Sequence, residues 1–478
     1  MRRVVMMIGG MVCGLALLAA CIQPVTRTDS PKESSIEMPA VVAQPVIYRE
    51  TTVTLPTYAY EAYQSDAVDE QYAWPYKKFD RERFLAEPPP IEEQTYRLLI
   101  LENEYLVVQI LPEIGGRIWQ VIHKPSGHTM FYQNPVIKPS PWGPGHQLGW
   151  IAAGGLEWNL PVIEHGYDWG TLWDYRISLI GSDTIAVVLS TPQDGRLIHA
   201  EMTVSLQTGV AAFDIEPLIM NRSGETLDMD YWHSAALAPG PENQPSAALR
   251  FISPGDTMIV HSTGNPQMPP PEGEFTWPIY NDLDLSLLGN WEQYLGFFES
   301  PAAVGPFVGI YDQEQDAGAV RIYPADVAQG NKVFGLGFND PIPSDNFTDD
   351  GSFYVEIHGG LAPSFFQSYT MEANANVIWR ERWYPLWGIG DFVTANEWGA
   401  LNVEANDGEM TASLYPTEPV VGTFYIFSEG QEMAAVAVEA SPAFPWLEVF
   451  DLEIGLEAWQ VQLVDRDGKI LIEAENSK

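Results

Sequence analysis

Residue types suited to acid–base chemistry gather in one short stretch, Gly154 to Gly170, which reads GGLEWNLPVIEHGYDWG. The stretch holds two carboxylates, Glu157 and Glu164, and the imidazole of His165. Its two leading glycines permit a tight, exposed bend, and Pro161 interrupts any regular helix or central strand. A glutamate and a histidine so close together can accept and donate protons to one bound molecule.

Flat and amide side chains accompany these acids and bases: Trp158, Asn159 and Trp169. Polar groups set among aromatic faces suit a sugar, which has hydroxyls on its edges and apolar C–H faces above and below. The alternative is a buried loop whose His and Glu side chains bond the backbone and whose tryptophans fill the core. Taken alone, the stretch leaves both interpretations open.

Composition indicates an exported globular protein. The chain has 478 residues, 46% of them hydrophobic and 18% charged, which is enough for two or three ordered domains. The formal net charge of -40 disfavours nucleic acid and polyanionic glycans, so we expect neutral or cationic ligands and no nucleic-acid partner. High solubility is the simpler explanation of the charge.

The N-terminus has the pattern of a signal peptide: Arg2 and Arg3, then an apolar run over 4–20, then Cys21. The ending Leu-Ala-Ala-Cys resembles the lipobox of bacterial lipoproteins, which implies a lipidated Cys21 and an envelope protein anchored outside the cytoplasm. An ordinary secretory signal is the alternative. The other cysteine, Cys13, lies within the leader, so we expect a mature chain without disulfides.

Strand patterns dominate the remaining chain. Residues 21–50, rich in Pro, Ser and Thr, predict a flexible tether, and 51–95 predict an aromatic, Pro-rich arm with a short helix near Arg81 to Leu85. Residues 96–395 predict a large antiparallel β-sandwich. Within it and beyond it, strands are expected at Tyr96–Leu101, Tyr105–Leu111, Arg117–His123, Thr129–Tyr132, Tyr175–Ile180, Thr184–Ser190, His199–Leu206, Ala211–Met220, Phe307–Tyr311, Ala319–Tyr323, Trp459–Val464 and Ile470–Ala474. The last two flank Asp465-Arg466-Asp467-Gly468, a hairpin signal within a small immunoglobulin-like β-domain over 396–478.

Several segments, in matching order over about 96–390, resemble the galactose mutarotase-like superfamily, whose fold is an antiparallel β-supersandwich. They are Glu104–Pro112 with Gly115–Ile118, His165–Tyr167, Asn221–Glu225 with Tyr231–Ser234, and Tyr354–Glu356 with Glu372–Trp379. A more specific resemblance, over 70–395, is to a family known only as a domain of unknown function, often attached to tetratricopeptide arrays. Its marks are Trp74–Tyr76, Leu101–Tyr105, Gly115–Ile118, Asn134–Pro139 and Gly154–Asn159.

The superfamily resemblance assigns roles to this chain. It implies Glu356 as a catalytic base, His233 as an acid and His165 as a helper or hydroxyl ligand in opening a sugar ring. Glu157 belongs to the uncharacterised family's own motif and is either a sugar ligand or a second catalytic acid. Glycoside hydrolysis by Glu157 and Glu356 is a further possibility.

Six side chains are candidates for substrate binding. Trp158, Tyr231 and Trp232 are possible stacking surfaces, although each could equally belong to the core. Arg117 and Asn159 could bind hydroxyls, and Arg117 could instead form an ion pair. Trp169 completes the binding candidates of the opening stretch.

Phosphosugar epimerases carry an arginine soon after the His-Gly-aromatic motif, but this chain has Asp168 and Trp169 there. An aspartate would repel a phosphate, so we do not expect a phosphosugar. The acidic segments 312–316 and 345–350 lack full calcium-loop spacing, and we expect neither metal nor cofactor.

We therefore expect a lipoprotein that binds carbohydrate and acts on a glycan or free sugar, like an epimerase or a hydrolase. The alternatives are a glycan-capture protein without catalysis and a structural envelope protein with a vestigial site. The sequence does not determine the sugar or the oligomeric state.

Overall fold

The computed structural model describes residues 43–140, 149–343, 346–406, 408–452 and 458–476. Cys21 and the predicted leader lie outside these ranges, as does the predicted tether up to residue 42. Strand β1 begins at Ile47, inside the segment predicted as tether, and pairs antiparallel along its whole length with β4. The predicted arm thus starts as part of a large sheet, and its predicted helix is α1, Arg81–Ala86.

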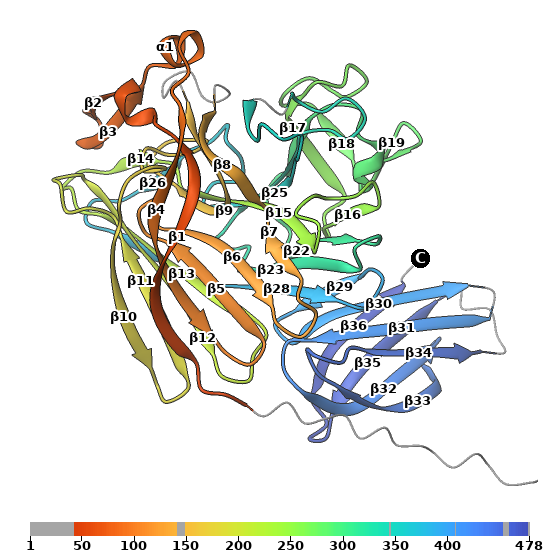
Figure 1. Ribbon diagram of the computed structural model, residues 1–478. Helices are drawn as coiled ribbons and strands as arrows, with labels where there is room; N and C mark the ends of the chain where they lie inside the picture. The colour runs from red at the N-terminus through yellow and green to blue at the C-terminus, as the bar shows by residue number, and fades with distance from the viewer. Residues whose placement is uncertain (1–42, 141–148, 344–345, 407, 453–457, 477–478) are drawn as a thin grey trace, which may run out of the picture. The chain divides into compact units, whose positions relative to one another are not determined.

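In the described part of the chain, the main body contains a thirteen-stranded and a nine-stranded sheet. The larger sheet has the spatial order β18 (Glu274–Thr276), β17 (Thr257–Thr263), β21 (Leu295–Glu299), β24 (Gly330–Gly335), β25 (Val355–Gly360), β15 (Trp232–Gly240), β7 (Thr129–Phe131), β6 (Arg117–His123), β5 (Leu106–Leu111), β4 (Ile91–Glu102), β1 (Ile47–Tyr58), β8 (Gln133–Ser140) and β9 (Trp150–Asn159). The smaller has the order β10 (Asp174–Ile180), β11 (Thr184–Ser190), β12 (Ile198–Gln207), β13 (Phe213–Asn221), β28 (Glu381–Trp387), β23 (Ala317–Ile322), β22 (Phe307–Asp312) and β16 (Leu249–Ile252), with β27 (Asn376–Ile378) beside β13. The predicted all-β antiparallel sandwich is confirmed (Figure 1).

Smaller elements complete the described chain. Three two-stranded ribbons are β2 (Gln64–Asp69) with β3 (Trp74–Phe79), β14 (Leu227–Met229) with β26 (Tyr369–Met371), and β19 (Ile279–Tyr280) with β20 (Leu283–Asp284). The 3-10 helices are Tyr60–Tyr63 and Leu288–Asn290. Among the described residues, no helix is long and apolar enough to cross a membrane.

The C-terminal strands form two four-stranded antiparallel sheets with their own apolar core. One contains β29 (Thr394–Asn396), β30 (Gly399–Asn406), β31 (Glu409–Pro416) and β34 (Trp446–Asp451); the other contains β33 (Gln431–Ala440), β32 (Val420–Ser428), β35 (Trp459–Asp465) and β36 (Ile470–Asn476). The predicted hairpin is confirmed, because β35 and β36 pair around its turn. An immunoglobulin-like topology stays a prediction.

Strand alternation builds the core of the main body. On the central strands β15 and β25, Ala235, Leu237, Val355 and Ile357 point between the two large sheets and join the main apolar cluster. Because successive side chains point to opposite faces, the intervening residues lie on the other face of the thirteen-stranded sheet. The candidate site lies on that face.

Candidate functional site

A pocket of about 440 Å³, including space open to solvent, contains a dense group of titratable side chains. It is lined by Trp150, Glu164, His165, His261, Ser262, Lys332, Phe334, Phe347, Tyr354, Glu356 and His358. A second hollow shares Trp150, Tyr354 and Glu356 with it and adds Arg117, Glu157 and Ser234. Among the predicted site residues, the structure therefore brings Glu356, His165, Glu157 and Arg117 to one place.

Three neighbouring strands place the centre of the pocket. Glu356 and His358 are two residues apart on β25, so they share a face, and the register sets Ser234 of β15 opposite His358. On the other side, β24 sets Lys332 opposite His358 and Phe334 opposite Glu356. These cross-strand neighbours lie within contact distance of one another because the strands are hydrogen-bonded.

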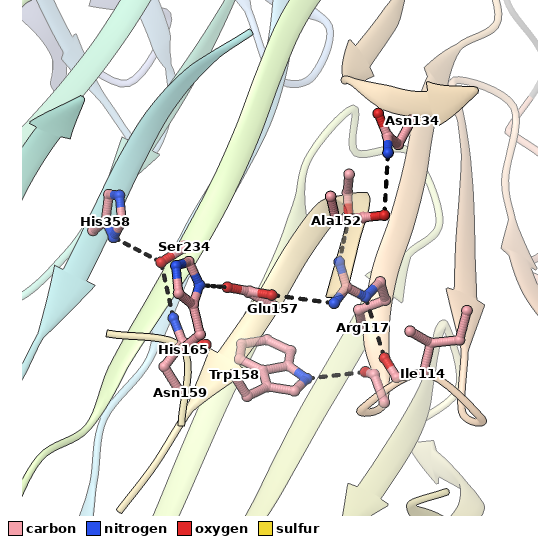
Figure 2. A network of polar contacts seen from close by, with 12 residues as sticks. Ile114, Arg117, Asn134, Ala152, Glu157, Trp158, Asn159, His165, Ser234 and His358 are labelled. Carbon is pink, nitrogen blue, oxygen red and sulfur yellow. Dashed lines mark hydrogen bonds and ion pairs between the residues drawn. The ribbon is translucent and has the colours of Figure 1, made fainter. Parts of the chain in front are cut away.

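A chain of hydrogen bonds leads to the Glu356 carboxylate (Figure 2 shows its first two links). Asn159 Nδ2 donates to Ser234 Oγ at 2.8 Å, Ser234 Oγ lies 2.6 Å from His358 Nδ1, and His358 Nε2 lies 2.8 Å from Glu356 Oε2. Since an amide nitrogen can only donate, the serine hydroxyl has its own proton left for His358 Nδ1. This arrangement puts the imidazole proton on Nε2, where it donates to Glu356.

A second chain holds His165. Its Nδ1 lies 2.6 Å from Glu157 Oε1, and the other oxygen of Glu157 accepts from Arg117 Nη2 at 3.1 Å (Figure 2). Arg117 is itself fixed by the carbonyl oxygens of Ile114 and Gly154. The His165 ring stacks on Trp150 with centroids 4.1 Å apart. With Nδ1 tied to Glu157, His165 presents Nε2 for a ligand.

The two glycines of the opening stretch make this placement possible, but from inside a strand and not from an exposed bend. Gly154 and Gly155 lie in β9 with φ of +76° and +75°. A Cβ atom would meet Tyr132 O at 2.1 Å at the first position and Ile118 O at 2.3 Å at the second. Left-handed backbone at this close approach requires glycine, and it carries β9 from its pairing with β8 to its pairing with β15.

Electrostatics separate the two groups best suited to proton transfer. Burial raises the pKa of Glu356, against the lowering effect of Lys332 and His165, and the net shift is upward. Burial lowers the pKa of His165, but the adjacent Glu157 carboxylate overcomes this and the net shift is also upward. A carboxyl and an imidazole with raised pKa values are a base and an acid suited to neutral pH.

Neighbouring groups have settled protonation states. Burial, with the charges of Lys332 and His165, holds the pKa of His358 well below its usual range, so this ring is neutral. Burial raises the pKa of Glu164, but the hydrogen bond with His261 and the charge of Lys332 outweigh the effect of burial. The pKa of this carboxyl therefore lies well below its usual range. His261 Nε2 lies 3.0 Å from Glu164 Oε1.

The structure does not place His233 in the pocket. Its side chain is fully buried on the opposite face of β15, where Nε2 lies 3.0 Å from Glu381 Oε2, and the ring contacts Trp383 edge-on. Glu381 also accepts from Arg321, and all three side chains lie between the two large sheets. The sequence motif identified the right strand, but alternation turns His233 away from the pocket and Ser234 toward it.

Most predicted stacking and binding residues lie in the core as well. Trp158 and Tyr231 belong to the main apolar cluster, Trp169 to a second cluster, and Trp232 packs edge-on against Phe365. Trp158 Nε1 donates to Gly116 O at 2.9 Å. Asn159 acts in the chain to Glu356 and lines neither hollow. None of these four aromatic side chains lines either hollow.

Asp168 is also buried and has a different role from the predicted one. It pairs with Arg196 at 2.6 Å and accepts from Trp74 Nε1 at 3.2 Å, which attaches β3 to the main body. The argument that Asp168 would repel a substrate phosphate is therefore wrong, because its charge is neutralised away from the pocket lining. Asp312, the first residue of the acidic segment 312–316, is likewise buried and accepts hydrogen bonds from Ser246 N and Oγ, both at 2.6 Å.

Sequence reasoning missed His358, Lys332, His261, Tyr354 and Trp150 as site residues. A usable signal existed for two of them: in Tyr354-Val355-Glu356-Ile357-His358, strand alternation puts Tyr354 and His358 on the face of Glu356. His261 and Lys332 lie on β17 and β24, which the patterns did not indicate. No short motif connects these strands to the pocket.

Solved structures are similar to this chain in fold. A TPR-domain-containing protein from Parabacteroides distasonis matches with 19% identity and a TM-score of 0.59 over 72% of this chain and 56% of that chain, so this chain spans just over half of that protein's length. A putative aldose 1-epimerase from Klebsiella pneumoniae matches with 12% identity and a TM-score of 0.44 over 70% and 91%. A galactose mutarotase-like protein from Clostridium acetobutylicum matches with 11% identity and a TM-score of 0.43 over 61% and 96%. These likenesses concern the fold alone.

The class of protein is thus an all-β sandwich of two large sheets with a titratable pocket on one face of the larger sheet. Residues 68–377, more than half of the chain, match the family model described as a domain of unknown function (DUF5107), and the chain belongs to that family. The predicted membership in an uncharacterised family is confirmed.

Proposed function

We propose that this protein catalyses acid–base chemistry at the anomeric centre of a neutral free sugar, with Glu356 as base and His165 as acid. The observation that carries the proposal is their meeting in one pocket, where burial raises the pKa of Glu356 and the Glu157 carboxylate, against burial, raises the pKa of His165. Perturbed groups of opposite role in one pocket are typical of active sites.

The reaction follows from the proton positions. The Glu356 carboxylate takes the proton of the anomeric hydroxyl while His165 Nε2 gives its proton to the ring oxygen. The C1–O5 bond breaks, the C1–O1 bond becomes a carbonyl, and an open-chain aldehyde forms. Rotation about C1–C2 and the reverse transfers close the ring on either face, which interconverts the anomers and restores both groups.

The charges around the pocket support a neutral ligand. The carboxylates of Glu164 and Glu356 face the cationic groups Lys332 and His165, which the pocket holds together. A ligand carboxylate or phosphate would add negative charge to these two carboxylates and two cationic groups without a matching cation. The chain's net charge of -40 would also oppose the approach of such a ligand.

Two alternatives receive less support. Glycan capture needs exposed aromatic faces, but Trp158, Trp169 and Trp232 are buried in the core. Two-carboxylate hydrolysis needs Glu157 to act beside Glu356, but His165 and Arg117 occupy one oxygen each of Glu157. Ring opening uses the residues as they lie.

We also propose that the protein is an exported lipoprotein attached through Cys21. The support is the sequence pattern before that residue, which lies outside the described part of the chain. Metabolic labelling with a fatty-acid probe tests the proposal: label that disappears in Cys21→Ser supports it, and a mature N-terminus at another residue contradicts it.

Exchange NMR on a panel of free aldoses tests the enzymatic proposal. Purified protein should accelerate exchange between the α and β anomer signals of at least one aldose. His165→Asn should abolish most of the acceleration, whereas His128→Asn, which changes a histidine outside the pocket, should keep it. A panel with no accelerated aldose would contradict the proposal.

A further inference from the structure

The pocket contains a buried amine that the proposed ring opening does not use. Lys332 lies on β24, is 4% exposed and lines the pocket beside Glu356 and His358. Its Nζ lies 4.5 Å from the ring centroid of Phe365 and 5.4 Å from that of Phe334. It makes no hydrogen bond or ion pair with any residue that the structure describes.

This isolation sets Lys332 apart from the other buried cations of the described chain. Arg117, Lys138, Arg196 and Arg321 each pair with a carboxylate, from Glu157, Asp349, Asp168 and Glu381 respectively. Lys332 has the carboxylates of Glu164 and Glu356 in its surroundings, but neither lies within 4.0 Å of Nζ. A buried ammonium without a carboxylate partner is costly, so burial increases the neutral fraction of this amine.

We propose that Lys332 is a nucleophile that forms an imine with an aldehyde in this pocket. The physiological ligand class is the open-chain aldose, and this assignment of class rests on the proposed ring opening. Reactivity toward a simple aldehyde does not depend on the proposed ring opening.

The chemistry balances without an outside reagent. The lone pair of neutral Nζ attacks the carbonyl carbon, the carbonyl oxygen gains a proton, and water leaves to form the C=N bond. Glu356 and the neutral rings of His358 and His261 are the groups on the same face that can transfer these protons. Phe334 and Phe365 limit water around Nζ, which opposes hydrolysis of the imine.

Electrostatics agree with this geometry. Burial lowers the pKa of Lys332, against the raising effect of Glu164 and Glu356, and the net shift is downward. An ordinary lysine, with a pKa of about 10.4, is neutral in roughly one molecule in 2,500 at pH 7. Each unit of lowering gives about tenfold more nucleophile.

Reductive trapping tests the proposal. The full exported chain is incubated at pH 7 with glycolaldehyde and sodium cyanoborohydride, and modified lysines are mapped by peptide mass spectrometry. Lys332 should be modified at least about tenfold faster than the exposed Lys78 and Lys469 in the same sample. Lys332→Arg should remove this fast phase while Lys78 and Lys469 react as before.

Equal or slower modification of Lys332 would overturn the proposal, and this result needs no variant to fold. The outcome is separable from that of the proposed function. Fast trapping of Lys332 without accelerated anomeric exchange supports the nucleophile and contradicts the ring-opening enzyme. Accelerated anomeric exchange without fast trapping supports the ring-opening enzyme and contradicts the nucleophile.

Discussion

The buried Glu381 carboxylate joins the two large sheets through its contacts with Arg321 and His233. It accepts from Arg321 Nε at 2.6 Å and Nη2 at 2.9 Å, from Trp379 Nε1 at 2.8 Å, and lies 3.0 Å from His233 Nε2. Glu381, Arg321 and His233 are fully buried. Four contacts, from two strands and from the link between β27 and β28, therefore converge on two oxygen atoms.

Glu381→Gln keeps the shape of the side chain and removes its charge. The amide has one acceptor oxygen, so its NH2 group must face at least one donor, and the Arg321 guanidinium loses its counterion in a dry core. Breaking a buried pair in this way costs about 3–5 kcal/mol. We expect a loss of stability of that size.

Urea unfolding, followed by tryptophan fluorescence, measures the effect, with Trp379 and Trp383 as reporters next to the change. Glu201→Gln is the matched control, because Glu201 pairs with Arg176 at the surface, where the side chains are 31% and 58% exposed. The control should lose no more than about 1 kcal/mol. A loss for Glu381→Gln as small as that of the control would refute the reasoning.

Three further predictions concern local features. Burial lowers the pKa of His123 to about 3. Because the unfolded histidine binds a proton near pH 6.5 and the folded one does not, the free energy of unfolding should fall as the pH drops from about 6.5 toward 3. His123→Gln should flatten this part of the pH profile measured by urea unfolding, and an unchanged profile would contradict the prediction. Ser234→Ala should remove the donor to His358 Nδ1 while Glu356 keeps the proton on Nε2, so long-range 15N–1H NMR should show a shifted Nδ1 resonance and a retained Nε2–H pattern; an unshifted Nδ1 resonance would contradict the hydrogen-bond direction assigned here. Gly468→Ala changes a glycine in an open turn and should cost roughly 1 kcal/mol of stability. Gly155→Ala should cost several times more, because its new Cβ atom would lie 2.3 Å from a carbonyl oxygen. Equal melting temperatures of the two variants would contradict this prediction.

Local patterns predicted much of the strand framework. The expected strands Arg117–His123 and Thr184–Ser190 match β6 and β11, because short turns and alternating side chains are encoded within a few residues. The hairpin around Asp465 was predicted for the same reason. Strands β17 and β24 were not, although each carries a residue of the pocket.

The site was less predictable because it depends on which face of a strand is covered. His233 and Ser234 are adjacent in the sequence, and the motif that contains both locates their strand but does not show which of the two side chains faces the pocket. Only the packing of Trp383 and Glu381 against one face decides that His233 enters the core. Likewise, pairing of β24 with β25 brings Lys332 beside His358 across 26 residues of sequence, and no local pattern records that contact.

Glu356→Gln tests the central proposal most directly, on whichever aldose the panel identifies. The variant keeps the shape and the hydrogen bond to His358 but removes the base. The kcat for anomeric exchange should fall on the order of 10²–10⁴-fold with little change in KM. An unchanged kcat in a folded Glu356→Gln variant would contradict the assignment of this pocket as an acid–base active site.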